Sequence, residues 1–552
     1  MNQAAPSEAS RRAANAQKLA SHPERSAWVD ASAGSGKTKV LTDRALRLML
    51  RHRAPERILC LTFTKAAAAE MANRLTARLA EWSAASEADI AQSLADMMDA
   101  QPSEQAIRTA RSLFARVVDA PGGLKVQTVH SFCQGALERF PIEAGAPPSF
   151  EALDERGAAE LRGAARDAVL RRILANQTEP ALAAALNRMA LRGGVENLDA
   201  VLLALLQERA RLAELAKQPG GATAAVLRAL GFKREDDLLT AEAEAADLDD
   251  AMLAALRRVG VALGAGGTRD RERADKIAAW LAADTATRRE TLAGLRSGFF
   301  KDGGEGPPFA DVATKAVVAD NPWLLETASA VIETLAAGLD RVRAADRGLD
   351  TLAALRLAEA IGDRYDRMKA ARAALDFDDL ILKTRDLLQS EGGAGWALYK
   401  LDQGIDHILV DEAQDTNPEQ WDIVRALTGE FFQPDAALRR TVFAVGDPKQ
   451  SIFSFQRADP AEFHKSQAQF RAASEAAGLP FAQVPLEVSF RSVPAVLQAV
   501  DATFAEAPAL DGLSPDGAPP RHSADRAGLP GHVEFWPVMP AAAAEESDPW
   551  TP

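Results

Sequence analysis

The segment from residue 31 to residue 38 (ASAGSGKT) has the residue types that bind the phosphates of a nucleotide. Small residues let the backbone wrap closely around phosphate oxygens, and the N–H groups at the start of a helix supply positive potential. Lys37 can reach the β- and γ-phosphates, and the hydroxyl of Thr38 can bind Mg²⁺. The usual pattern begins with glycine where this chain has Ala31, so the segment alone leaves a flexible Gly-Ser loop as the alternative. The candidate phosphate-binding residues are Ala31, Ser32, Ala33, Gly34, Ser35, Gly36, Lys37 and Thr38.

Two adjacent carboxylates, Asp411 and Glu412, follow a short apolar run in the segment ILVDEAQD. Asp411 can hold Mg²⁺ through water, and Glu412 can orient a water molecule for attack on a phosphate. The alternative is a solvated acidic loop after a strand. A hydrolytic nucleotide site needs both this pair and a phosphate-binding loop, so their presence in one chain favours nucleotide hydrolysis.

Five short apolar runs are expected to position these residues, because each ends in a polar, charged or glycine-containing cluster. Strands of parallel sheets are buried on both faces and read as continuous apolar runs, and ligands bind beyond their carboxyl ends. We therefore expect an α/β fold with a parallel sheet whose terminal clusters meet in one crevice. The runs cover residues 27–30, 58–63, 125–130, 408–411 and 441–447.

The pattern changes in the middle of the chain to apolar residues at helical spacing, such as Leu198, Val201 and Leu205, which predicts a large all-helical insertion. After Gly478 a strand-like run and a helical pattern precede an end rich in Pro, Gly and Ala. The expected domains are a first nucleotide-binding domain in two parts, 1–145 and 371–475, the insertion, 146–370, and the start of a second such domain, 476–552.

Composition limits the classes of function. The 552 residues include 64 basic and 78 acidic side chains, a formal net charge of −14, so any contact with nucleic acid has to be local rather than through bulk charge. With only two cysteines, the chain has no disulfide framework and no multi-cysteine metal site. The polar N-terminus and the lack of a long uncharged apolar run predict a cytoplasmic protein without a membrane contact.

Taken in order, the motifs resemble those of superfamily 1A helicases of the UvrD/PcrA/RecB type, and most closely the AddA-type subunits of AddAB helicase–nucleases. A RecB-type chain is the near alternative. The resemblance to AddA rests on residues 138–150 (ERFPIEAGAPPSF), on LDFDDL at 375–380 and on the wording of motif III. The matching blocks are motif I at 31–38, motif Ia at 61–71 (LTFTKAAAAEM), a DNA-contacting motif at 126–132 (VQTVHSF), motif II at 411–415 (DEAQD), motif III at 445–460 (VGDPKQSIFSFQRADP) and motif IV at 485–492 (PLEVSFRS).

This resemblance implies RecA-like domains and ATP- and Mg²⁺-dependent 3′-to-5′ translocation along one DNA strand in the repair of double-strand breaks. The implied partners are single-stranded or duplex-end DNA and an AddB-like nuclease chain. The resemblance also makes Gln17 the residue that reads adenine, Gln450 a sensor of the γ-phosphate, and Arg491 a γ-phosphate contact from the second RecA-like domain. An arginine supplied across a cleft stabilises the charge of phosphoryl transfer only when the cleft is closed. For Arg491 the alternative is a surface salt bridge.

By the same resemblance, single-stranded DNA contacts are expected in three of the motifs. Aromatic faces stack on any base for about 1 to 3 kcal/mol each, which suits a sequence-tolerant motor. Residues 441–500 contain as many acidic as basic side chains, so the grip there is not mainly electrostatic. The aromatic residues could instead belong to the core, and the histidine could be a hydrogen-bonded structural residue. The residues are Phe63, Thr64, Thr128, His130, Phe453 and Phe455.

Some positions depart from the pattern of the family. Phe453 stands where tyrosine is common, and Arg457 stands where a glycine precedes the Ala-Asp pair, a tight backbone position near the expected DNA path. Motifs V and VI and the nuclease residues do not occur in this sequence. We therefore expect an incomplete second RecA-like domain with a partly disordered tail, and a chain that alone binds Mg²⁺-ATP, hydrolyses it slowly and does not unwind duplex DNA. The alternatives are a stand-alone UvrD-like repair helicase and a non-hydrolysing ATP-binding scaffold in a DNA-repair complex.

Overall fold

The computed structural model describes residues 8–51, 53–98, 101–390, 394–402, 404–433, 439–452, 457–513 and 517–539. These residues form two compact units. The first, which we call the sheet unit, contains the described residues up to Asp154 and from Ala373 onward. The second, the helical unit, runs from Glu155 to Arg372, close to the expected insertion at 146–370.

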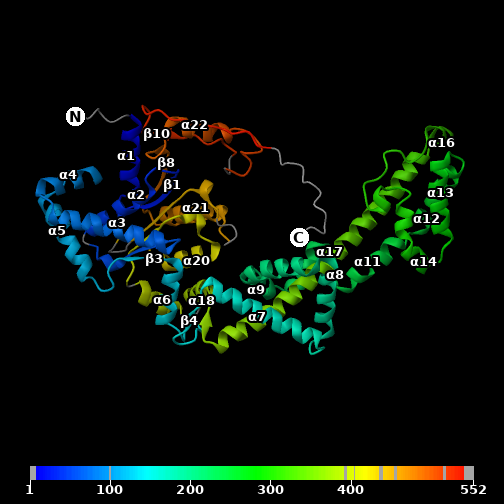
Figure 1. Ribbon diagram of the computed structural model, residues 1–552, viewed down its shortest axis with the longest axis horizontal. Helices are drawn as coiled ribbons and strands as arrows, with labels where there is room; N and C mark the ends of the chain where they lie inside the picture. The colour runs from blue at the N-terminus through cyan, green and yellow to red at the C-terminus, as the bar shows by residue number, and fades with distance from the viewer. Residues whose placement is uncertain are drawn as a thin grey trace, which may run out of the picture. The chain divides into compact units, whose positions relative to one another are not determined.

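A six-stranded sheet forms the centre of the sheet unit, in the order β3-β2-β6-β7-β1-β8 (Figure 1). All neighbouring strands pair in parallel, which confirms the predicted α/β fold with a parallel sheet. All five predicted apolar runs contain one of these strands. The strands are β1 (Ser26–Ala31), β2 (Ile58–Thr62), β3 (Lys125–Thr128), β6 (His407–Val410), β7 (Thr441–Gly446) and β8 (Phe481–Leu486).

Helices cover both faces of this sheet, so its strands are buried on both sides. Along β1, Val29 and Ala31 belong to the core under α2, α3 and α5, while Trp28 belongs to the core under α6, α18, α20 and α21. The rings of Trp28 and Trp421 stack with centroids 5.3 Å apart. The helices of this unit are α1 (Glu8–Ala20), α2 (Lys37–Leu50), α3 (Lys65–Ala84), α4 (Glu87–Met97), α5 (Glu104–Asp119), α6 (Val129–Arg139), α18 (Phe377–Gln389), α19 (Ala394–Asp402), α20 (Pro418–Leu427), α21 (Pro460–Ala476) and α22 (Pro494–Thr503), with the short 3₁₀ turns η1 (Pro55–Arg57), η3 (Ala413–Asp415) and η4 (Pro448–Gln450).

Two strands end where a threonine starts the next helix. The hydroxyl of Thr128 accepts a hydrogen bond from the N–H of Ser131, and the hydroxyl of Thr64 accepts one from the N–H of Ala67. Such N-caps satisfy donors that the first turn of a helix leaves free. The run predicted as strand at 125–130 is therefore strand only to Thr128, and His130 lies in the first turn of α6.

The expected domain boundary at residue 476 differs from the structure. Strand β8 pairs along its whole length with β1, from Ser26 opposite Phe481 to Ala31 opposite Leu486, and so extends the first sheet. The physical reason is that α21 returns the chain to the free edge of β1, where β8 completes its hydrogen bonding. Beyond β8, the two-residue strands β9 (Val488–Ser489) and β10 (Ser523–Ala524) pair in parallel. Residues 540–552 of the expected tail lie outside the described residues.

The chain leaves and re-enters the sheet unit at one place. Strand β4 (Glu151–Ala152) pairs in parallel with β5 (Ala374–Leu375), and the N–H of Leu153 donates to the carbonyl of Leu375 at 2.8 Å. The helical unit is thus inserted between two adjacent points of the sheet unit.

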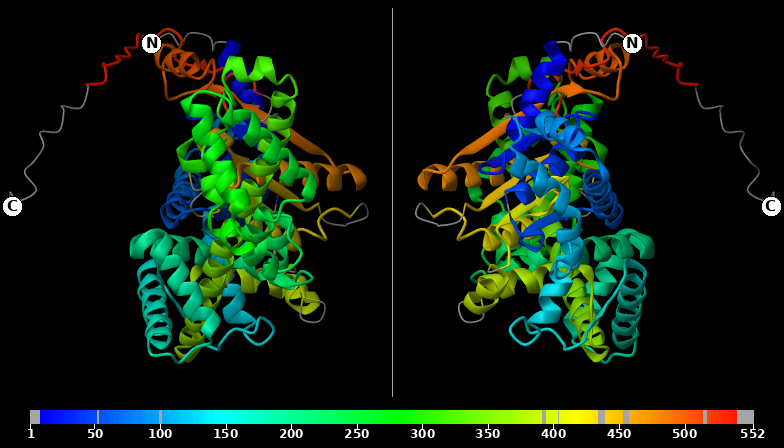
Figure 2. Two further views of the ribbon diagram at one scale, coloured as in Figure 1. Left: turned by 90° about the vertical axis from the view of Figure 1, so that its right-hand side faces the viewer. Right: turned by 90° about the vertical axis from the view of Figure 1, so that its left-hand side faces the viewer.

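The helical unit consists of helices joined by loops (Figure 2), with α17 in contact with α7, α8, α10, α11 and α12. Although α17 has 48 residues, charged side chains recur along it. Within the described ranges, no helix combines the length and apolarity needed to cross a membrane. The elements are α7 (Glu155–Leu174), α8 (Pro180–Gln207), α9 (Arg209–Lys217), α10 (Gly221–Ala229), α11 (Asp236–Ala246), α12 (Asp250–Gly264), α13 (Thr268–Ala282), α14 (Thr285–Glu290), α15 (Leu292–Arg296), η2 (Asp302–Gly304), α16 (Lys315–Asp320) and α17 (Leu324–Ala371).

Gly446, the last residue of β7, provides a test of this packing. A Cβ atom there would lie 2.6 Å from Oε1 of Gln414 and 2.9 Å from a ring carbon of Phe463. We expect Gly446→Ala to lower the free energy of unfolding by about 1 to 3 kcal/mol, because the core has no room for the methyl group. Urea denaturation followed by circular dichroism measures the change.

The matched control is Gly135→Ala in α6, where a Cβ would meet nothing within 4 Å. This substitution should leave stability unchanged or raise it by up to about 1 kcal/mol, because alanine favours the helix. Equal losses in the two variants would contradict the packing described at Gly446.

Candidate nucleotide-binding site and nucleic-acid surface

The loop after β1 is shaped by two glycines in left-handed conformations. Gly34 has φ +74° and Gly36 has φ +95°, and α2 begins directly afterwards at Lys37. Side chains other than glycine rarely adopt such angles, so the loop needs both residues. The N–H groups of the first turn of α2 are left without carbonyl partners inside the helix, as an anion site requires. Ala31, by contrast, is an ordinary residue of β1 and is fully buried, so glycine is not needed there.

Gln17 of α1 lies against this loop, as the resemblance implies. Its Nε2 atom donates a hydrogen bond to the carbonyl oxygen of Ser35 at 3.1 Å, and its side chain is 6% exposed. A Cβ at Gly36 would lie 2.8 Å from the same Nε2 atom. The carboxamide therefore stands at the phosphate loop because Gly36 leaves space for it.

Lys37 and Glu412 meet beyond the carboxyl ends of the strands. The Nζ atom of Lys37 lies 2.8 Å from Oε2 of Glu412, with side-chain exposures of 14% and 35%. Glu412 has φ +48°, a left-handed conformation that turns the chain sharply after β6. A non-glycine residue in that conformation is strained, and such strain is typical of functional sites. The structure thus brings together the lysine and the carboxylate pair that the sequence analysis assigned to one site.

Asp411 is a buried carboxylate next to Glu412. Its N–H donates to the carbonyl of Leu61 at 2.9 Å, which continues the pairing of β6 with β2. Burial, and then the charge of Glu412, raise the pKa of Asp411 to about 6. A cation would relieve this cost, and one or two carboxylates are what a Mg²⁺ ion shared with phosphate oxygens takes from a protein. Asp411 and the hydroxyl of Thr38 fit such an ion; in the part of the chain that the structure describes, no group of three His, Cys, Asp or Glu residues forms a metal site by itself.

Gln414 joins the acidic segment to β7, a role that the sequence analysis did not assign. Its Nε2 atom donates to Oε2 of Glu412 and to Oδ2 of Asp415, both at 2.9 Å, and its Oε1 accepts from the N–H of Asp447 at 2.9 Å. The side chain is 2% exposed. The only signal in the sequence was its place inside DEAQD, and the polar partners on both sides appear only in the fold.

Gln450, expected to sense a γ-phosphate, is held by Asp447. Its Nε2 atom donates to Oδ2 of Asp447 at 2.5 Å, and Nζ of Lys449 lies 3.0 Å from Oδ1 of the same carboxylate. Asp447 is 2% exposed and follows β7 directly. Because Asp447 also donates to Gln414, the residues after β6 and β7 form one hydrogen-bonded network.

The segment after β8 closes over the phosphate loop. The N–H of Phe490 donates to the carbonyl of Gly34 at 2.9 Å, and a Cβ at Gly34 would lie 2.6 Å from the Cβ of Arg491. The side chain of Arg491 is exposed, and among the described residues its guanidinium has no carboxylate partner. A surface salt bridge, the alternative for this arginine, is therefore not what the described residues provide.

A hollow of about 720 Å³ opens beside Gln17 and is large enough for a nucleoside. Lys39 and Phe490 line it together with residues of α3 and α4, among them Trp82 and Met97. Phe490 had no assigned role in the sequence analysis. Its place next to Arg491 was the available signal, and the ring presents an apolar face to the same hollow as Gln17.

The expected DNA-contacting residues divide between caps and exposed aromatic surface. Phe63 is half-buried and Thr64 is exposed, while Thr128 is buried and its hydroxyl caps α6. His130 is half-buried, and burial lowers the pKa of its imidazole below the usual range. Phe453 and Phe455 lie outside the described residues.

Phe377, the first residue of α18, extends this surface beside His130. The two rings have centroids 5.1 Å apart at an interplanar angle of 53°, and Phe377 is 41% exposed. The sequence analysis used LDFDDL only for the resemblance and assigned the phenylalanine no role. Its exposure and its contact with His130 appear only in the fold.

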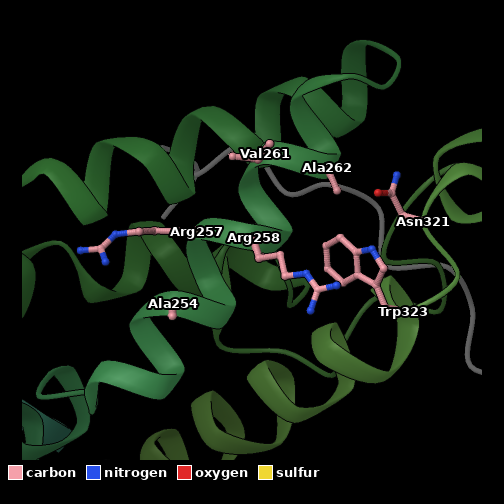
Figure 3. A pocket seen from close by; sticks show the side chains of 7 residues that line it. All are labelled: Ala254, Arg257, Arg258, Val261, Ala262, Asn321 and Trp323. Atoms are coloured by element: carbon pink, nitrogen blue, oxygen red, sulfur yellow. The ribbon is translucent and has the colours of Figure 1, made fainter.

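A separate hollow of about 450 Å³ lies within the helical unit, at α12 and the segment before α17 (Figure 3). There the guanidinium of Arg258 lies over the ring of Trp323, 3.7 Å from its centroid, next to the exposed Val261. None of the residues expected to bind nucleotide or DNA belongs to this unit.

Comparison with known proteins identifies the class. Residues 13–471 match the model of the UvrD/REP helicase N-terminal domain family, and the chain belongs to that family. Curated relatives include an ATP-dependent helicase/nuclease subunit from Pelotomaculum thermopropionicum, of the kind designated A, which is 29% identical over 86% of this chain and 37% of its own length. One with the same designation from Desulforudis audaxviator is 28% identical over 90% of this chain and 40% of its own length. The RecBCD enzyme subunit RecB of Mycolicibacterium smegmatis is 33% identical over 23% of this chain and 11% of its length.

The chain thus spans about two-fifths of the length of the helicase/nuclease subunits that it matches along most of its own length. The recognised resemblance to UvrD-type helicases is confirmed, and AddA-type subunits are among the relatives, as expected.

Gln414 offers a test of the network around the acidic segment. Gln414→Glu keeps the shape of the side chain but replaces the donor between Glu412 and Asp415 with a further buried carboxylate. We expect a loss of more than about 2 kcal/mol in the free energy of unfolding at neutral pH, because buried carboxylates repel and lack donors. Urea denaturation in the presence of EDTA measures it.

The control is Gln134→Glu on α6, whose Nε2 atom also donates to a carboxylate, that of Glu138, but at an exposed position. It should change stability by less than about 0.5 kcal/mol. A small effect at Gln414 as well would show that the network does not hold the segment in place.

Proposed function

We propose that this chain supplies the nucleotide-binding and single-strand-binding part of an ATP-dependent 3′-to-5′ DNA helicase of the AddA type. The observation that carries the proposal is the contact between Lys37 and Glu412 at 2.8 Å, because it joins the phosphate loop to the acidic pair at one edge of the sheet. The family membership and the names of the relatives support the helicase class. Double-strand-break repair with an AddB-like nuclease partner follows from the same names and stays part of the proposal.

Each residue of the site has a role in this proposal. The N–H groups of the loop and Lys37 bind the phosphates, and Lys37 leaves Glu412 as the triphosphate arrives. Glu412 then accepts a hydrogen bond from the attacking water and later its proton. Asp411 and Thr38 hold Mg²⁺, which when bound neutralises charge on the phosphates. Arg491 approaches the γ-phosphate from the segment that closes over Gly34.

The base of the nucleotide is proposed to lie in the hollow beside α1. Gln17 stands at the phosphate loop and offers both a donor and an acceptor, which matches the amino group and ring nitrogen on one edge of adenine. Phe490 supplies an apolar ring face in the same hollow. Stacking and paired hydrogen bonds together would favour adenine over guanine.

Single-stranded DNA is proposed to bind over Phe63, Thr64 and the pair formed by His130 and Phe377. The acidic chain repels DNA at long range, so short-range stacking has to supply most of the affinity. Motif III, with Phe453 and Phe455, is proposed to contribute to the same path by resemblance.

Two other functions belong to different classes. A stand-alone UvrD-like repair helicase would use the same site without a nuclease partner, and co-purification of the full-length gene product with a nuclease partner distinguishes it. An ATP-binding scaffold would bind nucleotide without using Glu412. The strained backbone of Glu412 and its contact with Lys37 favour a catalytic role, because a scaffold does not need either.

Nucleotide binding can be tested at Lys37 and Glu412. We expect Lys37→Met to weaken binding of a fluorescent ATP analogue with Mg²⁺ about ten- to a hundred-fold, as loss of a charge-assisted hydrogen bond predicts. Glu412→Gln should bind the analogue a few-fold more tightly, because Lys37 no longer has to leave a carboxylate. Equilibrium titration of the 552-residue chain measures both affinities.

Lys39→Met is the matched control, since Lys39 lies on the same helix but is 57% exposed and pairs with Asp43. Its affinity for the analogue should stay within about three-fold of the unaltered chain, the range of a screened surface charge. Binding that ignores Lys37 would refute the nucleotide site.

Single-strand binding can be tested at Phe377. We expect Phe377→Ala to weaken binding of an oligo(dT) about ten-fold, because one base loses its stacking partner. The salt dependence should not change, because no phosphate contact is removed. Fluorescence anisotropy at several salt concentrations measures both quantities.

Trp396→Ala provides the control, as another exposed aromatic residue of the sheet unit that stacks on Tyr399 and has no place in the proposed surface. Its affinity for oligo(dT) should be unchanged. If both variants bind as the unaltered chain does, DNA does not stack on Phe377.

A further inference from the structure

Arg457 occupies a backbone position that favours glycine. Its φ is +66°, in the left-handed region, and it precedes the Ala-Asp pair that leads into α21. For a residue with a side chain this conformation costs about 1 to 2 kcal/mol. Glycine would avoid the cost, so the arginine side chain has to contribute something that offsets it.

The side chain of Arg457 is buried against carboxylates from two helices. It is 9% exposed; Nη2 lies 2.9 Å from Oδ1 of Asp378, and Nη1 lies 3.6 Å from Oε1 of Glu419. Asp378 is in the first turn of α18 and Glu419 is in the first turn of α20. An arginine stays charged in such a place, so the contact is a true ion pair.

Asp378 is the residue next to Phe377 in the proposed DNA surface. Its side chain is 39% exposed, and its charge acts on His130, the ring that contacts Phe377. A carboxylate there would repel DNA phosphates, because screening at physiological salt extends only over about 8 Å. The aromatic pair therefore needs a cation beside Asp378 if a DNA strand is to approach it.

We propose that Arg457 is a positioning residue of the single-strand-binding surface, whose buried guanidinium neutralises Asp378 and so lets phosphates approach Phe377 and His130. The inference rests on the proposed DNA-binding function and adds a residue that does not itself contact DNA. Because the ion pair also ties the start of α21 to the start of α18, it fixes Asp378 on the side of the arginine.

A purely structural role makes a different prediction. Buried ion pairs often add little net stability, and glycine would remove the backbone strain, so stability alone gives weak reason for an arginine at this position. A structural arginine would affect the free energy of unfolding, whereas a charge-neutralising arginine affects DNA affinity through Asp378. The two roles are separated by removing both charges together.

The experiment compares Arg457→Gly, Asp378→Asn and the double variant in binding to oligo(dT), by fluorescence anisotropy at about 0.1 M salt. Arg457→Gly keeps the backbone conformation and should bind about five- to ten-fold more weakly, because Asp378 is exposed as a free charge. Asp378→Asn should bind more tightly than the unaltered chain. The double variant should recover the affinity lost in Arg457→Gly, and the differences should shrink at about 0.5 M salt.

Urea denaturation and binding of the Mg²⁺-ATP analogue, measured on the same proteins, check that each variant is folded. Unchanged DNA affinity in Arg457→Gly, or a double variant that binds as weakly as Arg457→Gly, would overturn the inference while the proposed function stands. If the unaltered chain does not bind oligo(dT), the proposed DNA-binding function fails, and the inference fails with it.

Discussion

The ion pair between Lys37 and Glu412 depends on the parallel arrangement of the sheet. Their strands, β1 and β6, are not neighbours, because β7 lies between them. Since all three run in the same direction, the residues that follow them emerge at one edge, and the lysine can reach across the end of β7. Gly446, the last residue of β7, leaves the space that Gln414 fills next to Glu412. An antiparallel strand, or a side chain at Gly446, would separate the two halves of the site.

Much of this site was predictable because its residues directly follow apolar runs. In parallel sheets such runs end at a common edge, so ASAGSGKT and DEAQD could be placed together without knowing the strand order. The order itself was not predictable, and this explains the difference at residue 476. The run at 484–488 reads as a strand whichever sheet it joins, and only the free edge of β1 determines that β8 completes the first sheet. Likewise the strand expected at 125–130 is shorter, because the hydroxyl of Thr128 starts a helix instead.

The residues that sequence analysis missed share a property: their partners come from distant parts of the chain. Gln414 is one polar residue within an acidic motif until β7 brings Asp447 to it. Phe377 reads as an ordinary helix-start residue until α6 places His130 against its ring. Arg457 was recognised as a departure from a glycine, but the carboxylates that bind it lie on α18 and α20. Spacing along one segment predicts which residues share a strand or helix face, and it does not predict which segments meet.

These contacts also connect the two proposed binding surfaces through one short stretch of chain. The stretch from Glu412 to Glu419 begins at Lys37 of the phosphate loop and ends at Arg457, beside the aromatic surface. Between these ends lie the 3₁₀ turn η3, with the buried Gln414 and Asp415, and the capping box of Asn417 that starts α20. A buried, hydrogen-bonded segment moves as a unit more readily than it bends, because its polar groups have no solvent to replace their partners. When Lys37 leaves Glu412 for a triphosphate, the segment loses one of the interactions that hold its first residue. The same segment carries the carboxylate of Glu419 that faces Arg457, so a change at the nucleotide has a direct covalent path to the residue that neutralises Asp378.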